Sequence, residues 1–175
     1  MKYIRSILNR DNVDEVISKY NLKHKADFAF YDLVYVNKDG TSITDDTLKI
    51  RVYQTNHWNN KDVLVIRKVA PLINGSKEDK VLLREEFDTV EEAQKFVDDN
   101  FLDSYEFAFK LQKSGIQYGN EVLDLWKEDV LDVGISVELG SEDESLLEEV
   151  FASLDNKERL DVSLPEYMYK KVKKI

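Results

Sequence analysis

The chain has 175 residues, 42% of them hydrophobic, and a formal net charge of −10 at pH 7. It is long enough to bury a core, and its composition excludes a largely disordered chain. The acidic balance argues against a broad nucleic-acid or membrane surface, and we expect neither partner. Cysteine is absent, which excludes disulfides and thiolate metal sites. No apolar run approaches the roughly 20 residues of a membrane span. The first residues also lack the apolar region of a signal peptide, so we expect a soluble, cytoplasmic protein.

The first half of the chain predicts one helix among five strands. Segment 2–8 is a short strand, and 11–20 is a helix because its apolar residues recur at helical spacing. Aromatic and β-branched residues predict four more strands, over 27–36, 47–55, 62–70 and 80–88. The polar stretch "NHWNNK", residues 56–61, predicts a hairpin between the third and fourth strands of the five.

The second half begins with a helix over 89–101, for which Thr89 and Glu92 form a capping box. Two strands follow, over 104–114 and 120–126, joined by a turn at 115–120, and the last strand covers 132–139. Ser141 and Glu144 form a second capping box at the start of a helix over 141–154. A basic helix over 163–175 ends the chain.

These elements predict a single domain of class α+β spanning residues 1–175, because no segment has the composition of a linker. Their order is strand, helix and three strands, which then occurs a second time before the final helices. Eight mostly antiparallel strands in two similar halves suggest a closed β-barrel with flanking helices, because closure removes exposed strand edges.

Charged residues recur at alternate positions of several predicted strands. In "VLLREEFDT", Arg84, Glu86 and Asp88 are spaced by two, so a regular strand points all three to one face. Lys49 and Arg51 have the same spacing. Such charges commonly form the solvated face of a half-buried sheet. The alternative is the interior of a barrel, where arginine and lysine bind phosphate oxygens and carboxylates hold Mg²⁺ or Mn²⁺.

Taken in order, these strands resemble the CYTH superfamily, the triphosphate tunnel fold of class IV adenylyl cyclases, thiamine triphosphatases and inorganic triphosphatases. The resemblance begins at "LKIR" (48–51) and continues through "LVIRKVAP" (64–71) and "REEFD" (84–88). It then follows "KSGIQY" (113–118), "VLDLW" (122–126) and the glutamate of "SVE" (136–138). The resemblance implies an eight-stranded tunnel that binds a small triphosphate or polyphosphate.

The resemblance also implies roles for individual residues. The residues implied in phosphate binding are Arg5, Lys49, Arg51, Arg67 (with Lys68 as the alternative to Arg67), Arg84 and Lys113. The residues implied in holding Mg²⁺ or Mn²⁺ are Glu86, Asp88, Glu138 and Asp124. Tyr118 matches the tyrosine of the family's K-x-R-x-x-Y stretch.

The chain departs from the family pattern at three places. The first strand, "MKYIRSIL", has neither glutamate of the family's E-x-E-x-K motif, and Arg5 stands in for its lysine. Gly115 replaces the arginine of K-x-R-x-x-Y, and only Glu138 remains of the late E-x-E, with Ser136 or Gly140 at the partner position. Hard cations depend on the number of carboxylates, so these losses weaken the implied metal site.

Three functions are therefore open at the level of sequence. The first is a metal-dependent phosphohydrolase acting on a small triphosphate, with an adenylyl cyclase as its variant. The second is a non-catalytic protein that binds a nucleotide, polyphosphate or other anion. The third is a fold used for contact with another protein.

Overall fold

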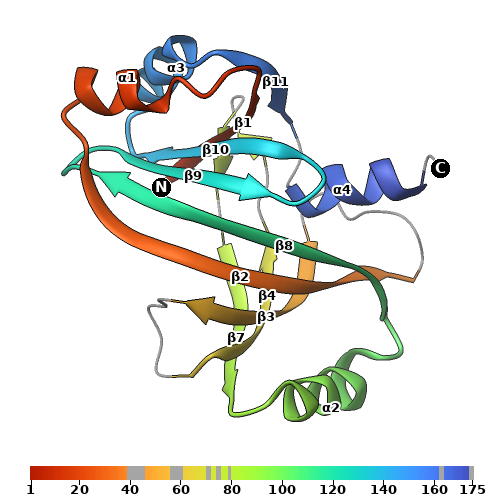
Figure 1. The fold of residues 1–175 in the computed structure, drawn as a ribbon. Coiled ribbons are helices and arrows are strands. Elements are labelled where there is room, and N and C mark those ends of the chain that lie inside the picture. Colours follow the sequence, from red (N-terminus) through yellow and green to blue (C-terminus); the bar gives the residue numbers. More distant parts are fainter. Residues whose placement is uncertain are drawn as a thin grey trace. The chain divides into compact units, whose positions relative to one another are not determined.

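The computed structural model describes residues 1–38, 46–55, 61–69, 72–73, 76–78, 80–161 and 164–173 (Figure 1). The chain forms two compact units. Unit 1 comprises Met1–Phe28, Pro71–Asp79 and Lys113–Asp161, and unit 2 comprises Ala29–Ala70, Lys80–Gln112 and Val162–Ile175. The single domain expected from the sequence stays a prediction.

The described residues form four helices and eleven strands, of which nine have at least five residues. The elements of unit 1 are β1 (Lys2–Leu8), α1 (Val13–Lys19), β5 (Leu72–Ile73), β6 (Ser76–Glu78), β9 (Asp124–Val130), β10 (Gly134–Ser141), α3 (Glu144–Ser153) and β11 (Asn156–Leu160). The elements of unit 2 are β3 (Asp46–Thr55), β4 (Val63–Val69), β7 (Lys80–Phe87), α2 (Val90–Phe101) and α4 (Leu164–Lys173). Two long neighbouring strands, β2 (Lys23–Asn37) and β8 (Tyr105–Gly119), run through both units.

Unit 1 is an antiparallel sheet with helices on one face. Its strands follow the order β5-β6-β1-β10-β9-β8, and β11 also pairs with β1. Because side chains alternate along a strand, Ile4, Leu139 and Leu125 share one face. That face packs against Val16 of α1 and Leu147 of α3 in one apolar cluster. The opposite face of these strands carries the charged residues discussed below.

Unit 2 repeats this arrangement with the strand order β2-β3-β4-β7 and helix α2. Leu48 and Ile50 of β3 pack with Val65 of β4 and with Ala93 and Val97 of α2. Helix α2 begins where it was predicted to, because Thr89 Oγ1 accepts a hydrogen bond from the Glu92 N–H at 3.2 Å. Each of the two units thus has one sheet face that is apolar and covered by helix, and a second face that carries charged residues.

The α+β class and the mostly antiparallel strands are confirmed, but the eight-stranded closed barrel is not. Within the described part of the chain, the hydrogen-bonded order has two ends, β5 and β7, and does not close. Strand β11, "NKERL", was missed because it is polar and lacks alternation. Alternation in a sequence identifies strands, whereas closure depends on which backbone edges pair, and that information is not local.

Two local predictions were wrong, and a third falls mostly on residues outside the described part of the chain. Strand β8 continues to Gly119 through the segment predicted as a turn, because Gly115 and Gly119 pair in register with β9. Asp143, rather than Ser141, caps α3, and its carboxylate accepts a hydrogen bond from the Leu146 N–H at 3.1 Å. The predicted link at 56–61 lies outside the described residues except for Lys61, although β3 and β4 pair as expected. Among the described residues, no helix is long and apolar enough to cross a membrane.

Candidate functional site: two charged sheet faces

The charged face of unit 1 is built by β1, β8, β9 and β10. Arg5 lies directly opposite Glu138, and Ser136 lies opposite Glu128, so strand register brings these four residues to one face. Lys113 joins them from β8. Three of the charged side chains, those of Arg5, Lys113 and Glu128, are less than 10% exposed. A buried group of this kind persists only when its charges are paired.

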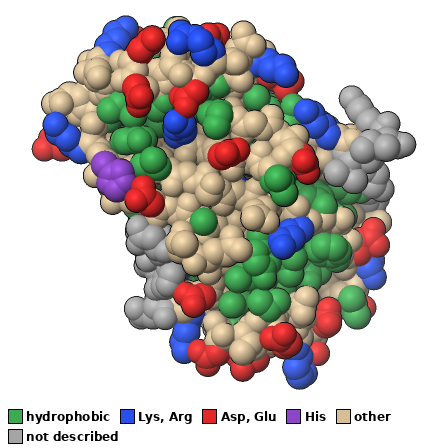
Figure 2. Space-filling view, in the orientation of Figure 1, with side chains coloured by type: hydrophobic (Ala, Val, Ile, Leu, Met, Phe, Trp, Pro, Cys, Tyr) green, Lys and Arg blue, Asp and Glu red, His purple; other side chains and the backbone are tan. Residues whose placement is uncertain are grey.

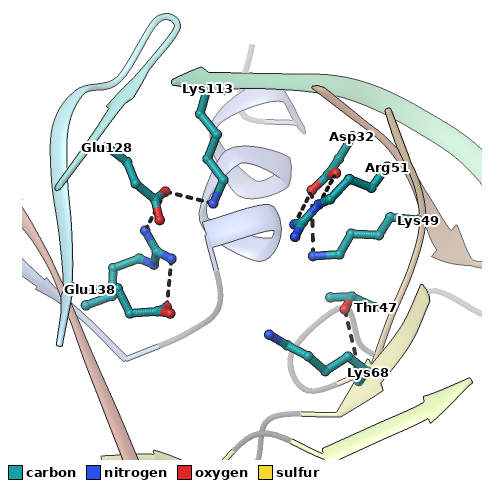
Figure 3. A network of polar contacts seen from close by, with 9 residues as sticks. Asp32, Thr47, Lys49, Arg51, Lys68, Lys113, Glu128 and Glu138 are labelled. Carbon is teal, nitrogen blue, oxygen red and sulfur yellow. Dashed lines mark hydrogen bonds and ion pairs between the residues drawn. The ribbon is translucent and has the colours of Figure 1, made fainter. Parts of the chain in front are cut away.

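The ion pairs in unit 1 are short, and Arg5 and Glu128 each take part in two of them (Figure 3). The Arg5 Nη1 donates to Glu128 Oε2 at 3.2 Å and to Ser136 Oγ at 3.0 Å, and its Nη2 donates to Glu138 Oε2 at 2.7 Å. Lys113 Nζ lies 2.7 Å from the same Glu128 oxygen. We call these five residues the unit 1 network. It contains two cations and two carboxylates, so its charges balance.

The pKa values of this network follow from burial and pairing. Burial alone would raise the pKa of Glu128, but Arg5 and Lys113 outweigh burial and hold the pKa below its ordinary value. Burial alone would lower the pKa of Arg5, but Glu128 and Glu138 outweigh it and raise that pKa. Arg5 and Glu128 are therefore both charged at neutral pH.

The charged face of unit 2 is centred on Asp32, whose side chain is 1% exposed. Asp32 lies opposite Arg51 in the register of β2 and β3. The Arg51 Nε and Nη2 donate to the two Asp32 oxygens at 2.8 and 2.9 Å, which is a bidentate pair. Asp32 outweighs the effect of burial and raises the pKa of Arg51. The guanidinium also lies over the Phe30 ring, 3.9 Å from its centroid.

Two lysines accompany Arg51 on this face. Lys49 Nζ lies 3.6 Å from the second Asp32 oxygen. Lys68 lies opposite Thr47, which places its side chain on the same face of the sheet. In Figure 3 the nitrogen ends of Lys49, Lys68 and Arg51 extend toward the same space. We call Asp32, Lys49, Arg51 and Lys68 the unit 2 cluster.

The two alternatives for the family's lysine lie on opposite faces. Arg67 is opposite Leu48, whose side chain belongs to the apolar cluster beneath α2. Its guanidinium carbon lies 6.0 Å from the centroid of Tyr105, a buried ring of the same cluster. Lys68 therefore shares a face with Lys49 and Arg51, whereas Arg67 does not.

The strand "VLLREEFDT" becomes β7, at one end of the strand order. Arg84 lies opposite Ile66 and Glu86 opposite Leu64, so both point to the charged face of unit 2. Their side chains are 43% and 33% exposed and lie 3.4 Å apart. Asp88 falls after the strand ends and pairs with Lys61. Charges on an end strand also protect it from edge pairing, so β7 has a structural role besides any site.

The remaining predicted residues belong to unit 1. Asp124 starts β9 and lies 2.8 Å from Lys25 Nζ. Tyr118 lies opposite Leu125 and packs against the apolar cluster, away from the unit 1 network. Gly115 has no room for a side chain, because a Cβ there would lie 2.2 Å from the Lys127 carbonyl oxygen. The arginine of the family pattern therefore could not occupy this backbone position.

The predicted metal-binding carboxylates do not form a metal-binding group in the part of the chain that the structure describes. Glu86, Asp88, Glu138 and Asp124 each pair with a lysine or arginine. No group of three or more His, Cys, Asp or Glu side chains that could hold a metal ion occurs among the described residues. These four carboxylates, each paired with a cation, do not supply the several oxygen ligands that Mg²⁺ or Mn²⁺ takes at once.

Two central residues, Asp32 and Glu128, were missed at the level of sequence. Asp32 alternates in phase with Phe28, Phe30 and Val34, all of which are buried. The sequence signal that could have identified Asp32 is a carboxylate at the alternate positions of a strand that are otherwise apolar. Glu128 follows Trp126 by two residues on one face, but the predicted strand ended at Trp126.

On the face drawn in Figure 2, described acidic and basic side chains are interspersed.

Neither a known protein family nor a curated protein sequence matches the chain. Solved structures do match it. The PH1819 protein from Pyrococcus horikoshii is 15% identical, with a TM-score of 0.71 over 98% of both chains. A candidate adenylate cyclase from Vibrio parahaemolyticus is 14% identical, with a TM-score of 0.62 over 96% of this chain and 98% of that one.

A third similar structure is the candidate adenylyl cyclase HpAC1 from Hippeastrum, which is said to have a dominant triphosphatase activity. It is 14% identical, with a TM-score of 0.58, and the match covers 87% of this chain and 85% of that one. Likeness at this identity shows a shared fold.

Proposed function

We propose that this chain binds a small polyphosphate anion, such as tripolyphosphate or a nucleoside triphosphate, through the charged face of unit 2. The supporting observation is the convergence of Lys49, Arg51 and Lys68, whose nitrogen ends extend toward the same space beside Asp32. Arginine and lysine ends directed to one space suit phosphoryl oxygens. Arg84 lies at the exposed end of the same face, where it pairs with Glu86.

The unit 1 network contributes less to this proposal. Both terminal nitrogens of Arg5 already bind carboxylates, and Lys113 shares Glu128 with it. The phosphate-binding roles implied for Arg5 and Lys113 therefore compete with ion pairs inside the protein. We assign this network to the stability of unit 1.

The proposal is tested by titrating the protein with tripolyphosphate, using orthophosphate for comparison and following thermal unfolding. Tripolyphosphate at a hundredfold excess over its dissociation constant would stabilise the protein by about 2.7 kcal/mol. Lys49→Ala is expected to weaken binding, whereas Lys95→Ala, which removes the same charge from the exposed side of α2, is expected to leave it unchanged. Equal effects of the two variants, or no stabilisation of the wild type, would contradict the proposal.

Triphosphate hydrolysis is a second candidate function, favoured by the likeness to HpAC1 and its triphosphatase activity. The assay combines the protein with tripolyphosphate, thiamine triphosphate or ATP, in Mg²⁺ or Mn²⁺, and measures both released phosphate and cyclic AMP. Phosphate release that Lys49→Ala abolishes would support a hydrolase, and cyclic AMP would support a cyclase. Binding without either product would leave a non-catalytic polyphosphate-binding protein.

A further inference from the structure

The side chain of Asp32 meets Arg51 along one particular edge of the guanidinium. The carboxylate takes the Nε–Nη2 edge, through hydrogen bonds of 2.8 and 2.9 Å. A guanidinium has five N–H donors, and this edge uses two of them. The side chain of Tyr53 also hydrogen-bonds the Arg51 guanidinium. The remaining N–H groups on the terminal nitrogens suit a phosphoryl group.

The plane of the same guanidinium is held from another direction. The Arg51 carbon Cζ lies 3.9 Å from the centroid of the Phe30 ring, within the range of a cation–π contact. Phe30 is itself packed edge-on to Tyr53, with the ring centroids 5.4 Å apart. Asp32 therefore sets the direction in which the Arg51 guanidinium, here called the fork, points, and Phe30 sets the plane of the guanidinium.

Arg5 shows the opposite arrangement within unit 1. Its two terminal nitrogens, rather than its Nε edge, bind Glu128 and Glu138. The terminal edge of Arg5 is thus occupied by the protein's own carboxylates. Arg51, by contrast, meets its carboxylate through Nε and one terminal nitrogen.

We propose that Asp32 is a positioning residue, which holds Arg51 by its Nε edge so that the terminal edge meets the phosphoryl oxygens of the bound anion. This inference rests on the proposed function, because it assigns a role within the same polyphosphate site. Burial of Asp32 at 1% exposure, beneath Arg51 at 17%, keeps the carboxylate behind the fork and away from the anion. Because the guanidinium is oriented before the anion binds, less side-chain entropy is lost on binding.

A different role for Asp32 predicts that neutralising it changes the affinity for the anion in the opposite direction. If the carboxylate served only as a counter-ion competing with the anion, its neutralisation would leave a stronger positive charge and tighten binding. If it positions Arg51, neutralisation loosens the fork and weakens binding despite the added positive charge. The direction of the change therefore separates the two roles.

The test compares Asp32→Asn with Asp27→Asn, which makes the same charge change at an exposed position of the same strand. Affinity for tripolyphosphate is measured by isothermal titration calorimetry on protein shown by circular dichroism to be folded. We expect Asp32→Asn to bind about tenfold more weakly than Asp27→Asn, which should match the wild type. Unchanged or tighter binding by Asp32→Asn would overturn the inference.

A double-mutant cycle with Arg51→Gln adds a measurement that a purely structural role would not change. Positioning predicts that Asp32→Asn has no further effect on affinity once Arg51 is replaced, whereas additive losses would contradict it. Should Asp32→Asn fail to fold, Asp32→Glu replaces it in both comparisons. That variant keeps the charge, moves the carboxylate by one methylene, and is expected to bind about tenfold more weakly. Wild-type affinity in Asp32→Glu would then refute positioning.

The outcomes for the two proposals are distinguishable. If the wild type does not bind tripolyphosphate, the proposed function itself fails. If the wild type binds and the Asp32 variants bind equally well, the polyphosphate site stands and only the role of Asp32 is refuted.

Discussion

Glu128 is the residue of unit 1 whose replacement has the clearest expected cost. Its side chain is 4% exposed and one of its oxygens meets both Arg5 and Lys113, at 3.2 and 2.7 Å. Glu128→Gln keeps the size and hydrogen-bonding capacity of the side chain but removes its charge. The two buried cations would then lose the carboxylate that they share. Breaking a buried ion pair from one side costs roughly 3 to 5 kcal/mol, and glutamine should bring the loss to about 3 kcal/mol.

The assay is urea unfolding at pH 7, with the free energy of unfolding obtained by linear extrapolation. Glu149→Gln, an exposed position of α3 in the same unit, is the matched control and should change stability by less than about 0.5 kcal/mol. Replacing Lys113 by methionine in the Glu128→Gln background should recover part of the loss, because it removes one of the two cations that Glu128 neutralised. A Glu128→Gln protein within about 1 kcal/mol of the wild type would refute the importance of this network.

The network also makes stability depend on pH. Because the folded-state pKa of Glu128 lies below its ordinary value of 4.5, its contribution is present above that pH and is lost as the pH falls further. Between pH 7 and pH 3, the free energy of unfolding measured in urea should fall less in Glu128→Gln than in the wild type. Equal decreases in the two proteins would contradict this. Gly115→Ala should lower the free energy of unfolding by about 1 to 3 kcal/mol, since its Cβ overlaps a backbone oxygen; Ser114→Ala, at an exposed neighbouring position, is the control. In calorimetric titrations, Lys68→Ala should raise the dissociation constant for tripolyphosphate about tenfold, or 1.4 kcal/mol, whereas Arg67→Ala should change it less than twofold. The reverse order would place Arg67, not Lys68, in the site.

Much of the local structure was predictable because it depends on short-range patterns. Alternation of apolar residues located β3, β4 and β7, and the Thr89 cap located the start of α2. Spacing by two also placed Lys49 and Arg51 on one face, and the register agrees. These features depend on residues within a few positions of one another, so the sequence carries them directly.

Other features depended on partners distant in the chain. Arg67 and Lys68 are adjacent in the sequence, and only the register between β3 and β4 assigns Lys68 to the charged face. The closed barrel was wrong because edge pairing is a relation among whole strands. Sequence spacing could not reveal that Glu128 binds Arg5, since 123 residues separate them.

From its sequence alone, this protein is recognisable as an α+β chain with charged strands resembling a polyphosphate-binding fold. Composition and alternation determine that much, because burial of apolar faces is the strongest constraint on a strand. Only the tertiary structure decides which charges are neutralised within the protein. Whether a lysine or arginine on such a face can bind phosphate depends on which of its N–H groups the fold pairs with a carboxylate. Arg5 is paired at its terminal edge and Arg51 is held from behind by Asp32, and that difference exists only once the strands are in register.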